Sequence, residues 1–448
     1  MRSRALVAGA VLAAALIGAS LAARMPVGVA LLAVACYAPV VAIDLELAIA
    51  LWAPLVFLQG IPALNTASKA AGLLLAAVWL AGLLGGLRDP VVLRRHRRLV
   101  WAVGALVAWL SLSALWAQDR SLVLADVWHW WAVAALFLMV ASSLRDTRAV
   151  KLVMLGMVIG AAASVVLGLA NGDLGRSAVE GASDRLKSGA GDPNVLAAGL
   201  VSAGVLAAAL MVPIRTALGR WALAVSIGLL CIGVVASESR GGALAALATA
   251  GASLVFFRRR RKQVSAVVLL ATGAVVVALA LFPSAWHRIS SYDNGGNGRT
   301  EIWTVAWRMT QDHPLVGVGL NNFDTRAGDY VRRPGALKRV RLVVDHPTVV
   351  HNIYLQLLAE DGLVGLLLFL SVAGACLRAA WSAARRFAAR GDPAGEALST
   401  AALVAGTSIL VAGFFISAGV DTRLWILFAL GPALLRASKP TLGRWRAT

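Results

Sequence analysis

His351 is the residue of this chain whose type and position best suit proton transfer. It directly follows the longest polar stretch, residues 282–350, and stands at the start of an apolar helix. The positive end of a helix dipole disfavours protonation of an imidazole, and a general base near neutral pH must be neutral. We therefore expect His351 to be a catalytic base, with Asn352 orienting the ring or donating to a substrate oxygen. The alternative for a lone histidine is a structural role.

Three arginines, Arg185, Arg240 and Arg299, lie in polar segments that could bind an anion. Arginine stays charged and holds phosphate oxygens with a two-pronged fork. Ser239 precedes Arg240, and two glycines follow it, which would let a bulky group approach the backbone. We expect the three guanidinium groups to bind an anionic group, with Ser239 in support. The alternative for Arg240 is structural, since an arginine at the end of a span reaches for the interface or pairs with a carboxylate such as Glu238.

Aromatic residues accompany two of these segments. Arg299, Trp303 and Trp307 recur at every fourth position and so share one face of a helix. Tyr354 follows His351 by three residues. We expect Trp303 and Tyr354 to support the site. Trp307 is expected to seat its helix at the membrane interface, where tryptophans gather for reasons unrelated to catalysis.

Two further segments favour structural roles. Asp192 would cap a helix whose first turn contains Pro193, with ligand contact as the alternative. Residues 314–323 (PLVGVGLNNF) resemble a phosphate-binding loop only superficially, because they lack a preceding strand and a Lys-Ser/Thr pair. This pattern predicts a tight turn that packs the long loop onto the membrane helices.

The composition indicates how these residues are positioned. The chain of 448 residues is 59% hydrophobic, only 14% charged, and has a mean hydropathy of +0.78, whereas a soluble domain carries roughly a quarter charged residues. Apolar runs of about 20 residues, enough to cross a bilayer, recur from near residue 14 and residue 35 onward. We predict an all-α polytopic membrane protein with about 12–14 transmembrane helices and one large extracytoplasmic loop containing short helices.

The same pattern divides the chain into four parts. Residues 1–170 form N-terminal transmembrane helices, and residues 171–282 form transmembrane helices with arginine motifs at their outer ends. Residues 283–350 form the large loop, and residues 351–448 form C-terminal transmembrane helices and a cytoplasmic tail.

The net charge of +20 is explained by topology. With the N-terminus in the cytoplasm and alternating spans, most of the 42 Lys and Arg residues fall on the cytoplasmic side, as the positive-inside rule expects. This arrangement places the long loop, residues 171–193 and the Ser239-Arg240 turn together on the outer side. The basic residues cluster at span ends without a soluble basic face, which excludes nucleic-acid binding.

Several other classes of protein are disfavoured. The three cysteines all fall in predicted spans, so they form neither a disulfide framework nor a metal set. The absence of a Walker sequence excludes an ATP-driven pump. The outer loops lack an Asp-x-Asp pair, which disfavours a glycosyltransferase that depends on a divalent metal. Acidic residues within spans are few, mainly Asp126 and the pair Glu360-Asp361, and this weakens a proton-coupled transporter.

The order of the motifs resembles that of the O-antigen ligase / O-antigen polymerase superfamily. The resemblance covers roughly residues 180–430 and rests on five segments. They are Arg185 to Asn194, Ser239-Arg240-Gly241-Gly242, Arg299-x-x-x-Trp303, Pro314-x-x-Gly317-x-Gly319-x-x-x-Phe323 and His351-Asn352-x-Tyr354-Leu355-x-x-Leu358-Ala359-Glu360-x-Gly362-Leu363-x-Gly365.

This resemblance implies a glycosyltransferase of the bacterial inner (plasma) membrane, with its active site on the periplasmic side. The implied donor is a glycan on undecaprenyl pyrophosphate. His351 would take the proton of the acceptor hydroxyl, and Arg240 and Arg299, with Arg185, would hold the pyrophosphate. Because pyrophosphate is a fair leaving group, one base and electrostatic stabilisation could suffice without a metal or cofactor.

The acceptor leaves several functions open. In ligases it is a sugar hydroxyl of the lipid A–core, which is the function we expect first. In polymerases it is the growing glycan, and in related enzymes it is a serine of a secreted protein. A transporter without chemistry would instead line a mid-membrane path with charged residues. A structural partner of envelope assembly would tolerate changes at His351.

Overall fold

The computed structural model describes residues 36–86, 97–170, 174–175, 185–187, 191–283, 285–286, 299–333 and 349–439. Helices dominate this part of the chain, and two-residue strands β1 (Leu174–Gly175) and β2 (Arg185–Leu186) pair antiparallel. The N-terminal helices are α3 (Leu45–Trp52), η1 (Ala53–Phe57), α4 (Pro62–Leu84), α6 (Arg97–Leu112), η2 (Ser113–Leu115), α7 (Arg120–Ser143) and α8 (Thr147–Ala170). The remaining helices are α9 (Pro193–Leu210), α10 (Ala217–Ala236), α11 (Arg240–Phe256), η4 (Arg258–Arg260), α12 (Arg261–Leu281), α14 (Arg299–Asp312), α15 (Phe323–Val331), α17 (Ile353–Ala389), α18 (Pro393–Ala412) and α19 (Thr422–Ala437).

The helical membrane architecture predicted from composition is confirmed. Within the described ranges, nine helices are long and apolar enough to cross a bilayer, and the segments Leu45–Phe57 and Arg240–Phe256 are shorter apolar helices. The chain is therefore a multi-pass membrane protein. The span expected near residue 14 lies outside the described residues, and so does the first half of the one near residue 35.

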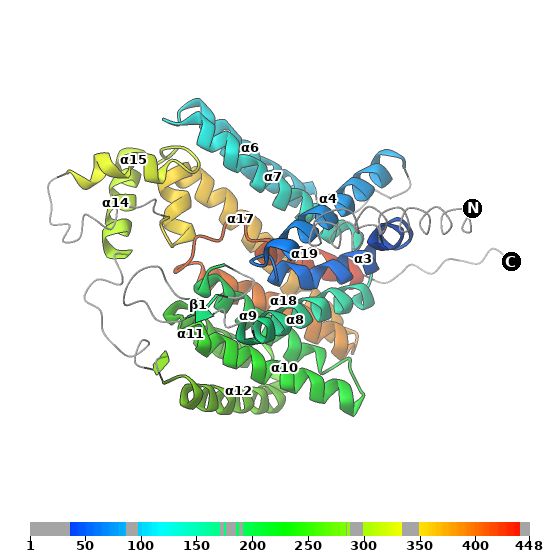
Figure 1. Ribbon diagram of the computed structural model, residues 1–448. Helices are drawn as coiled ribbons and strands as arrows, with labels where there is room; N and C mark the ends of the chain where they lie inside the picture. The colour runs from blue at the N-terminus through cyan, green and yellow to red at the C-terminus, as the bar shows by residue number, and fades with distance from the viewer. Residues whose placement is uncertain are drawn as a thin grey trace, which may run out of the picture.

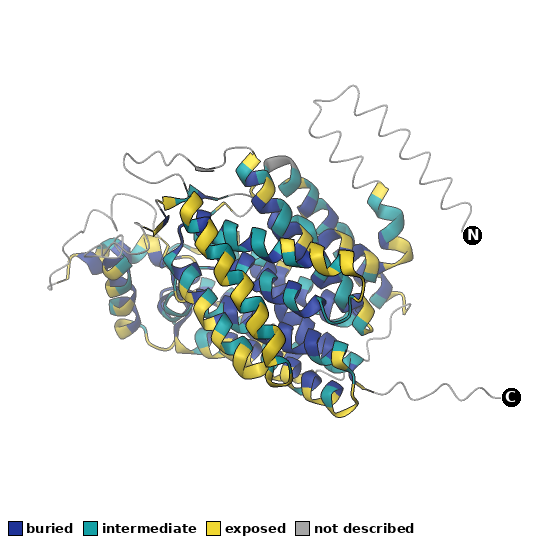
Figure 2. Ribbon diagram, turned by 90° about the horizontal axis from the view of Figure 1, so that it is seen from below, coloured by how far each residue is buried: buried dark blue, intermediate teal, exposed yellow. Residues whose placement is uncertain are grey.

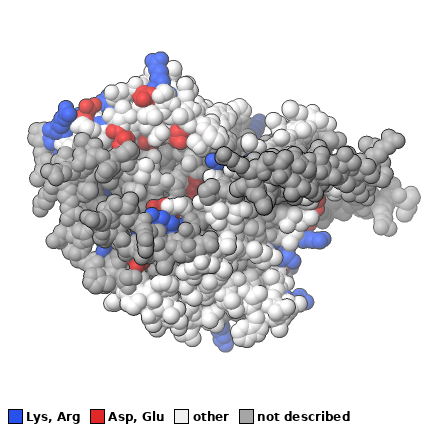
Figure 3. All heavy atoms as spheres, in the orientation of Figure 1, with Lys and Arg blue, Asp and Glu red and all other residues white. Residues whose placement is uncertain are grey.

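Apolar packing and surface charge agree with this arrangement. Figure 2 shows buried residues in the middle of the bundle and exposed ones on the helices nearest the viewer. In Figure 3 charged side chains gather toward the end that carries α14 and α15, and a broad surface beyond them is largely uncharged. An uncharged belt between polar ends is what a bilayer requires of a helical protein.

Five helices, α7, α9, α11, α17 and α19, begin at one end of the bundle, which we call the loop end. Contacts between their first residues and the connections beside them hold these starts together, for example the hydrogen bond from Ile353 N to Gly413 O at 2.9 Å. Each start is capped by a side chain that accepts a backbone N–H bond; the caps are Asp119, Asp192, Ser239, Asn352 and Asp421. Converging helix N-termini make the loop end favourable for anions.

Helices α14 and α15 lie together at the loop end (Figure 1) and contribute to a small second core. Its buried members come from both helices, from residues 318 and 350, and from the first turns of α17. The Arg308 guanidinium on α14 donates to Tyr330 O on α15 at 2.8 Å. This part of the long loop is therefore a folded unit attached to the start of α17.

Helix α17 is broken at Gly362, where φ is +69° and ψ is −173°. Residues 314–319 dock into the break. Val318 N donates to Ala359 O at 3.0 Å, Gly319 N donates to Glu360 O at 2.7 Å, and Leu363 N donates to Pro314 O at 2.8 Å. The loop thus satisfies backbone groups that the break leaves unpaired. The prediction that residues 314–323 pack the loop onto the membrane helices is confirmed.

Substituting alanine for Gly362 should be severely destabilising, by about 3 kcal/mol or more. The backbone conformation there is one that only glycine adopts readily, and a Cβ would overlap the Leu315 carbonyl. Gly374 is the matched control, because it lies in the same helix and a Cβ there meets nothing within 4 Å. Gly374→Ala should be neutral or slightly stabilising. Thermal unfolding in detergent measures both, and equal melting temperatures for the two variants would contradict the packing described.

Candidate active site

His351 stands in a left-handed backbone conformation, with φ at +53°, immediately before the cap of α17. The Asn352 side-chain oxygen accepts hydrogen bonds from Tyr354 N at 3.0 Å and Leu355 N at 3.1 Å. Asn352 therefore acts through the backbone: its cap sets where the helix begins and so where His351 projects. The His351 side chain is half-buried at the loop end.

Trp303 ties α14 to the segment that carries His351. Its indole N–H donates to Val350 O at 2.9 Å, and Val350 is fully buried. Arg299 begins the same helix. Trp303 thus links the arginine and the histidine mechanically, whereas Trp307 is 52% exposed and lies on the surface.

A hydrogen-bonded network connects the starts of α9 and α11. The Asn194 side-chain oxygen accepts from Ser239 Oγ at 2.9 Å and from Arg185 Nη2 at 3.1 Å. Arg185 Nε also donates to Ser237 O at 2.9 Å. These bonds hold Arg185 and the turn that leads into Arg240 next to one another, so two segments 50 residues apart in the chain form one wall of the site.

The space beside the two glycines that follow Arg240 is filled by other parts of the protein. A Cβ at Gly241 would lie 2.8 Å from the Phe415 Cβ, and one at Gly242 would lie 2.5 Å from the Ala197 Cβ. The sequence predicted that these glycines let a bulky group approach the backbone. In the structure the groups that approach are side chains of a neighbouring helix and a neighbouring connection, and this close packing holds α11 against α9 at the loop end.

Charge interactions connect His351, Arg299, Arg240 and Asp192 through a chain of pairs: Asp192 acts on His351 and Arg299, Arg299 acts on His351, and Arg240 acts on Arg299. Burial lowers the pKa of His351, the positive charge of Arg299 lowers it further, and the carboxylate of Asp192 opposes both effects. Burial also lowers the pKa of Arg299, with Asp192 raising it and Arg240 lowering it. The result is an imidazole that is neutral at neutral pH near the Arg299 guanidinium, which in turn is near that of Arg240.

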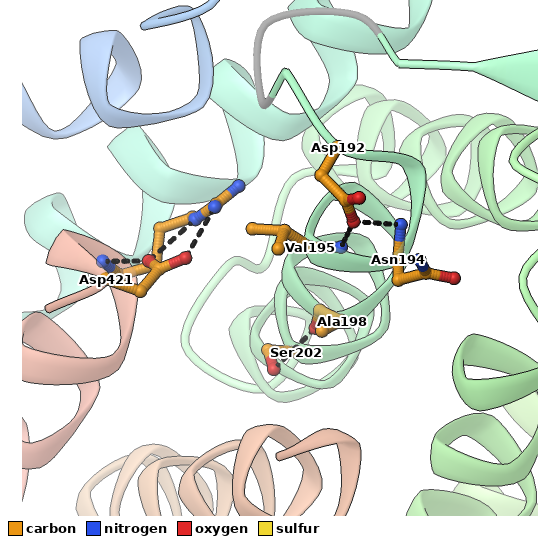
Figure 4. A network of polar contacts seen from close by, with 7 residues as sticks. Asp192, Asn194, Val195, Ala198, Ser202 and Asp421 are labelled. Atoms are coloured by element: carbon orange, nitrogen blue, oxygen red, sulfur yellow. Dashed lines mark hydrogen bonds and ion pairs between the residues drawn. The ribbon is translucent and has the colours of Figure 1, made fainter. Parts of the chain in front are cut away.

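Asp192 has two roles in this cluster, as a helix cap and as a charge near His351 and Arg299, and the sequence indicated only the first. Its Oδ1 accepts from Asn194 N at 2.8 Å and Val195 N at 3.0 Å, which confirms the helix cap (Figure 4). Its charge also acts on His351 and Arg299. The capping pattern pointed only to the structural role, because the partners in the loop come from more than 100 residues away in the chain.

Another carboxylate, that of Asp421, lies at the start of α19 beside α9 (Figure 4). It caps the helix and forms a two-pronged ion pair with Arg423, with the shorter contact at 2.6 Å. Both side chains are nearly fully buried. No pattern in the sequence separated this pair from an ordinary interfacial arginine.

Tyr354 contacts the end of α18. Its hydroxyl donates to Leu410 O at 2.5 Å, and its ring packs on Phe414 with centroids 4.5 Å apart. Tyr354 therefore anchors α17 to the end of α18. In the part of the chain that the structure describes, no three His, Cys, Asp or Glu side chains are grouped so as to hold a metal ion.

Comparison with protein families adds an independent observation. Residues 224–370 match the family model described as O-antigen ligase. Over this part of the sequence the chain is similar to the O-antigen ligase domains of the Wzy_C family. The domain contains Ser239, Arg240, Arg299, Trp303 and His351, whereas Arg185 and Asp192 come before it. The family implies a ligase or polymerase glycosyltransferase acting on lipid-linked glycans. The chain has no match among curated proteins.

Proposed function

We propose that the protein is an O-antigen ligase-type glycosyltransferase. It transfers a glycan from undecaprenyl pyrophosphate to a sugar hydroxyl of the lipid A–core, and it works on the periplasmic side of the bacterial inner membrane. The observation that carries the proposal is the neutral His351 whose pKa is lowered by the charge of Arg299, with Arg240 acting in turn on Arg299, at converging helix N-termini. A base beside a concentrated positive field is what glycosyl transfer from a pyrophosphate requires.

The reaction conserves atoms and charge without any further reactant. The acceptor oxygen attacks the anomeric carbon while its proton passes to the neutral imidazole of His351. The bond between the anomeric carbon and the phosphate oxygen breaks, and the electron pair stays on the leaving pyrophosphate. Arg240 and Arg299 stabilise the charge that develops there, because each guanidinium can hold two phosphate oxygens. Direct displacement of this kind inverts the anomeric centre.

Arg185 contributes differently in this proposal. Two of its nitrogens are bonded to Ser237 O and to the Asn194 side chain. Its positive charge adds to the field at the pyrophosphate, while those bonds position the start of α11 and hence Arg240. Ser239, Trp303 and Tyr354 support the site through the contacts described above.

A transfer assay with purified protein in detergent tests this proposal. Undecaprenyl-pyrophosphate glycan would be offered with lipid A–core, in the presence and absence of EDTA. Transfer to lipid A–core that survives EDTA is the expected result. Lengthening of the donor glycan instead would assign the protein to the polymerases. Absence of both products with donor and acceptor from the native organism would refute the enzymatic proposal and favour a transporter or an assembly partner.

The pH dependence of transfer should reveal the charges around His351. Because the pKa of His351 lies below its ordinary value, the rate should hold its plateau at neutral pH and fall only as the pH drops below about 6.5. Arg299→Gln removes a charge that lowers this pKa, so the acidic limb of the residual activity should move to higher pH. Asp192→Asn removes a charge that raises it, so that limb should move to lower pH.

These two variants control for each other. Asparagine caps helices as well as aspartate does. The Asp192→Asn variant should therefore preserve the start of α9 and have the melting temperature of the wild-type protein. The sign of each shift is what pH–rate profiles would measure. Shifts in the same direction, or unshifted profiles in both variants, would contradict the assignment of the acidic limb to His351.

A further inference from the structure

A basic pocket lies at the end of the bundle opposite the loop end. Five consecutive basic residues, Arg258 to Lys262, occupy the turn between α11 and α12. Together with Gln263, Gly391, Pro393 and Glu396 they line a pocket of about 670 Å³. Helices α11 and α17 both start at the loop end, near His351, and finish at this pocket. The pocket is therefore spatially separate from the catalytic cluster.

Two helical hairpins build this pocket. Arg259 Nη1 donates to Ala388 O and Arg260 Nη2 donates to Pro393 O, each at 3.4 Å, which links the α11–α12 turn to the α17–α18 turn. Arg260 Nη1 also donates to the Gln263 side chain at 3.0 Å. These bonds gather guanidinium groups from the first hairpin around backbone carbonyls of the second.

The charge in the pocket is strongly unbalanced. Glu396 is the one acidic residue among those that line it, and its carboxylate lies 3.9 Å from Arg259. Four consecutive arginines and a lysine thus face a single carboxylate. Like charges this close repel one another, and an anion seated among them would relieve the repulsion. The positive-inside rule explains basic residues at this end of the bundle, but it does not require them to surround a pocket.

Helix α12 supplies an apolar surface that continues from the pocket. The helix begins at Arg261, inside the pocket lining, and of its residues only Ala278 is buried. Its exposed side chains include Leu269, Val276, Val277 and Leu281. A ligand with a charged head in the pocket would therefore find a hydrocarbon-compatible surface along the length of α12.

We propose that this pocket binds the phosphate group of an anionic phospholipid whose acyl chains lie along α12. Clusters of four to eight basic residues next to a membrane span attract anionic headgroups, with a gain of roughly 1 kcal/mol for each Lys or Arg. The apolar surface of α12 distinguishes a lipid from free phosphate, which shares the headgroup chemistry but makes no use of that surface. Binding here would fasten α12 and the C-terminal helices to one leaflet.

Native mass spectrometry of the full chain, purified in detergent and titrated with phosphatidylglycerol or phosphatidylcholine, tests this site. The wild-type protein should retain phosphatidylglycerol in preference to phosphatidylcholine. The triple variant Arg258→Gln, Arg259→Gln, Arg261→Gln should lose this preference by about tenfold or more. The matched control is Arg378→Gln, Arg385→Gln, Arg386→Gln, which removes equal charge from exposed arginines of α17 outside the pocket lining. A similar loss in both triple variants would overturn the pocket in favour of diffuse charge.

A gain-of-function variant guards against misfolding of the triple variant. Glu396→Gln removes the one carboxylate of the pocket lining, so phosphatidylglycerol binding should tighten several-fold, and weaker or unchanged binding would overturn the proposal.

Inorganic phosphate in excess provides the second arm of the test. If it displaces phosphatidylglycerol fully from the wild-type protein, the pocket is a phosphate site and the role assigned to α12 is wrong. Retention of the lipid supports the proposal.

Discussion

Replacing His351 by asparagine should lower the rate of glycan transfer by about 10²- to 10⁴-fold, the range that a general base contributes. Asparagine is the informative substitution because residue 351 has a positive φ, a conformation that asparagine tolerates and most other residues do not. The variant therefore removes the base while keeping the backbone before the α17 cap. The rate of transfer to lipid A–core at neutral pH is the measurement.

Two comparisons make the His351 result specific. His351→Ala should also abolish transfer, but it adds backbone strain, so a lower melting temperature than that of His351→Asn is expected. His313→Asn changes a histidine on the loop that lies outside the charged cluster and should leave the rate within about twofold of wild type. Near-normal transfer by His351→Asn would rule out His351 as the base.

Conservative replacement of either central arginine should also be costly. Arg240→Lys and Arg299→Lys should each reduce transfer by about 10²- to 10³-fold, the loss typical of removing one donor to a developing negative charge. Lysine keeps the charge but loses the planar fork that holds two phosphate oxygens. Arg332→Lys, at an exposed position after α15, is the matched control and should behave as wild type.

The double variant tests whether both arginines act on the same group. If Arg240 and Arg299 hold one pyrophosphate, their losses should fail to add, as expected for residues that share a partner. The rates of the two single variants and of the double variant form the required cycle. Full activity of Arg240→Lys would contradict a two-pronged clamp at that position, whatever the result for Arg299.

The clustering of the predicted site residues has a simple physical origin. Each apolar span reverses the direction of the chain, so an even number of spans between two polar segments returns them to the same end of the bundle. Arg185 and Ser239 are separated by α9 and α10, and their side chains both contact Asn194. Counting spans was therefore enough to place these segments together.

Details within the cluster were less accessible to prediction. Trp303 has the pattern of an interfacial tryptophan, yet it donates to Val350 O and braces the segment before His351. Arg185 has the pattern of a free anion-binding residue, yet it is bonded to Ser237 O and Asn194. Such contacts depend on the relative rotation and depth of helices, and a periodic pattern of apolar residues does not specify either.

The sequence by itself determined the multi-pass helical fold, the loop that carries short helices, and the residues that gather at the loop end. Hydrophobic burial and the cost of an unpaired backbone in a bilayer leave few other arrangements for such a chain. Only the tertiary structure revealed the break at Gly362, because that conformation is stabilised by backbone groups of residues 314–319. Only the tertiary structure revealed that the charge of Asp192 acts on His351 and Arg299, because electrostatic interactions depend on distances in space.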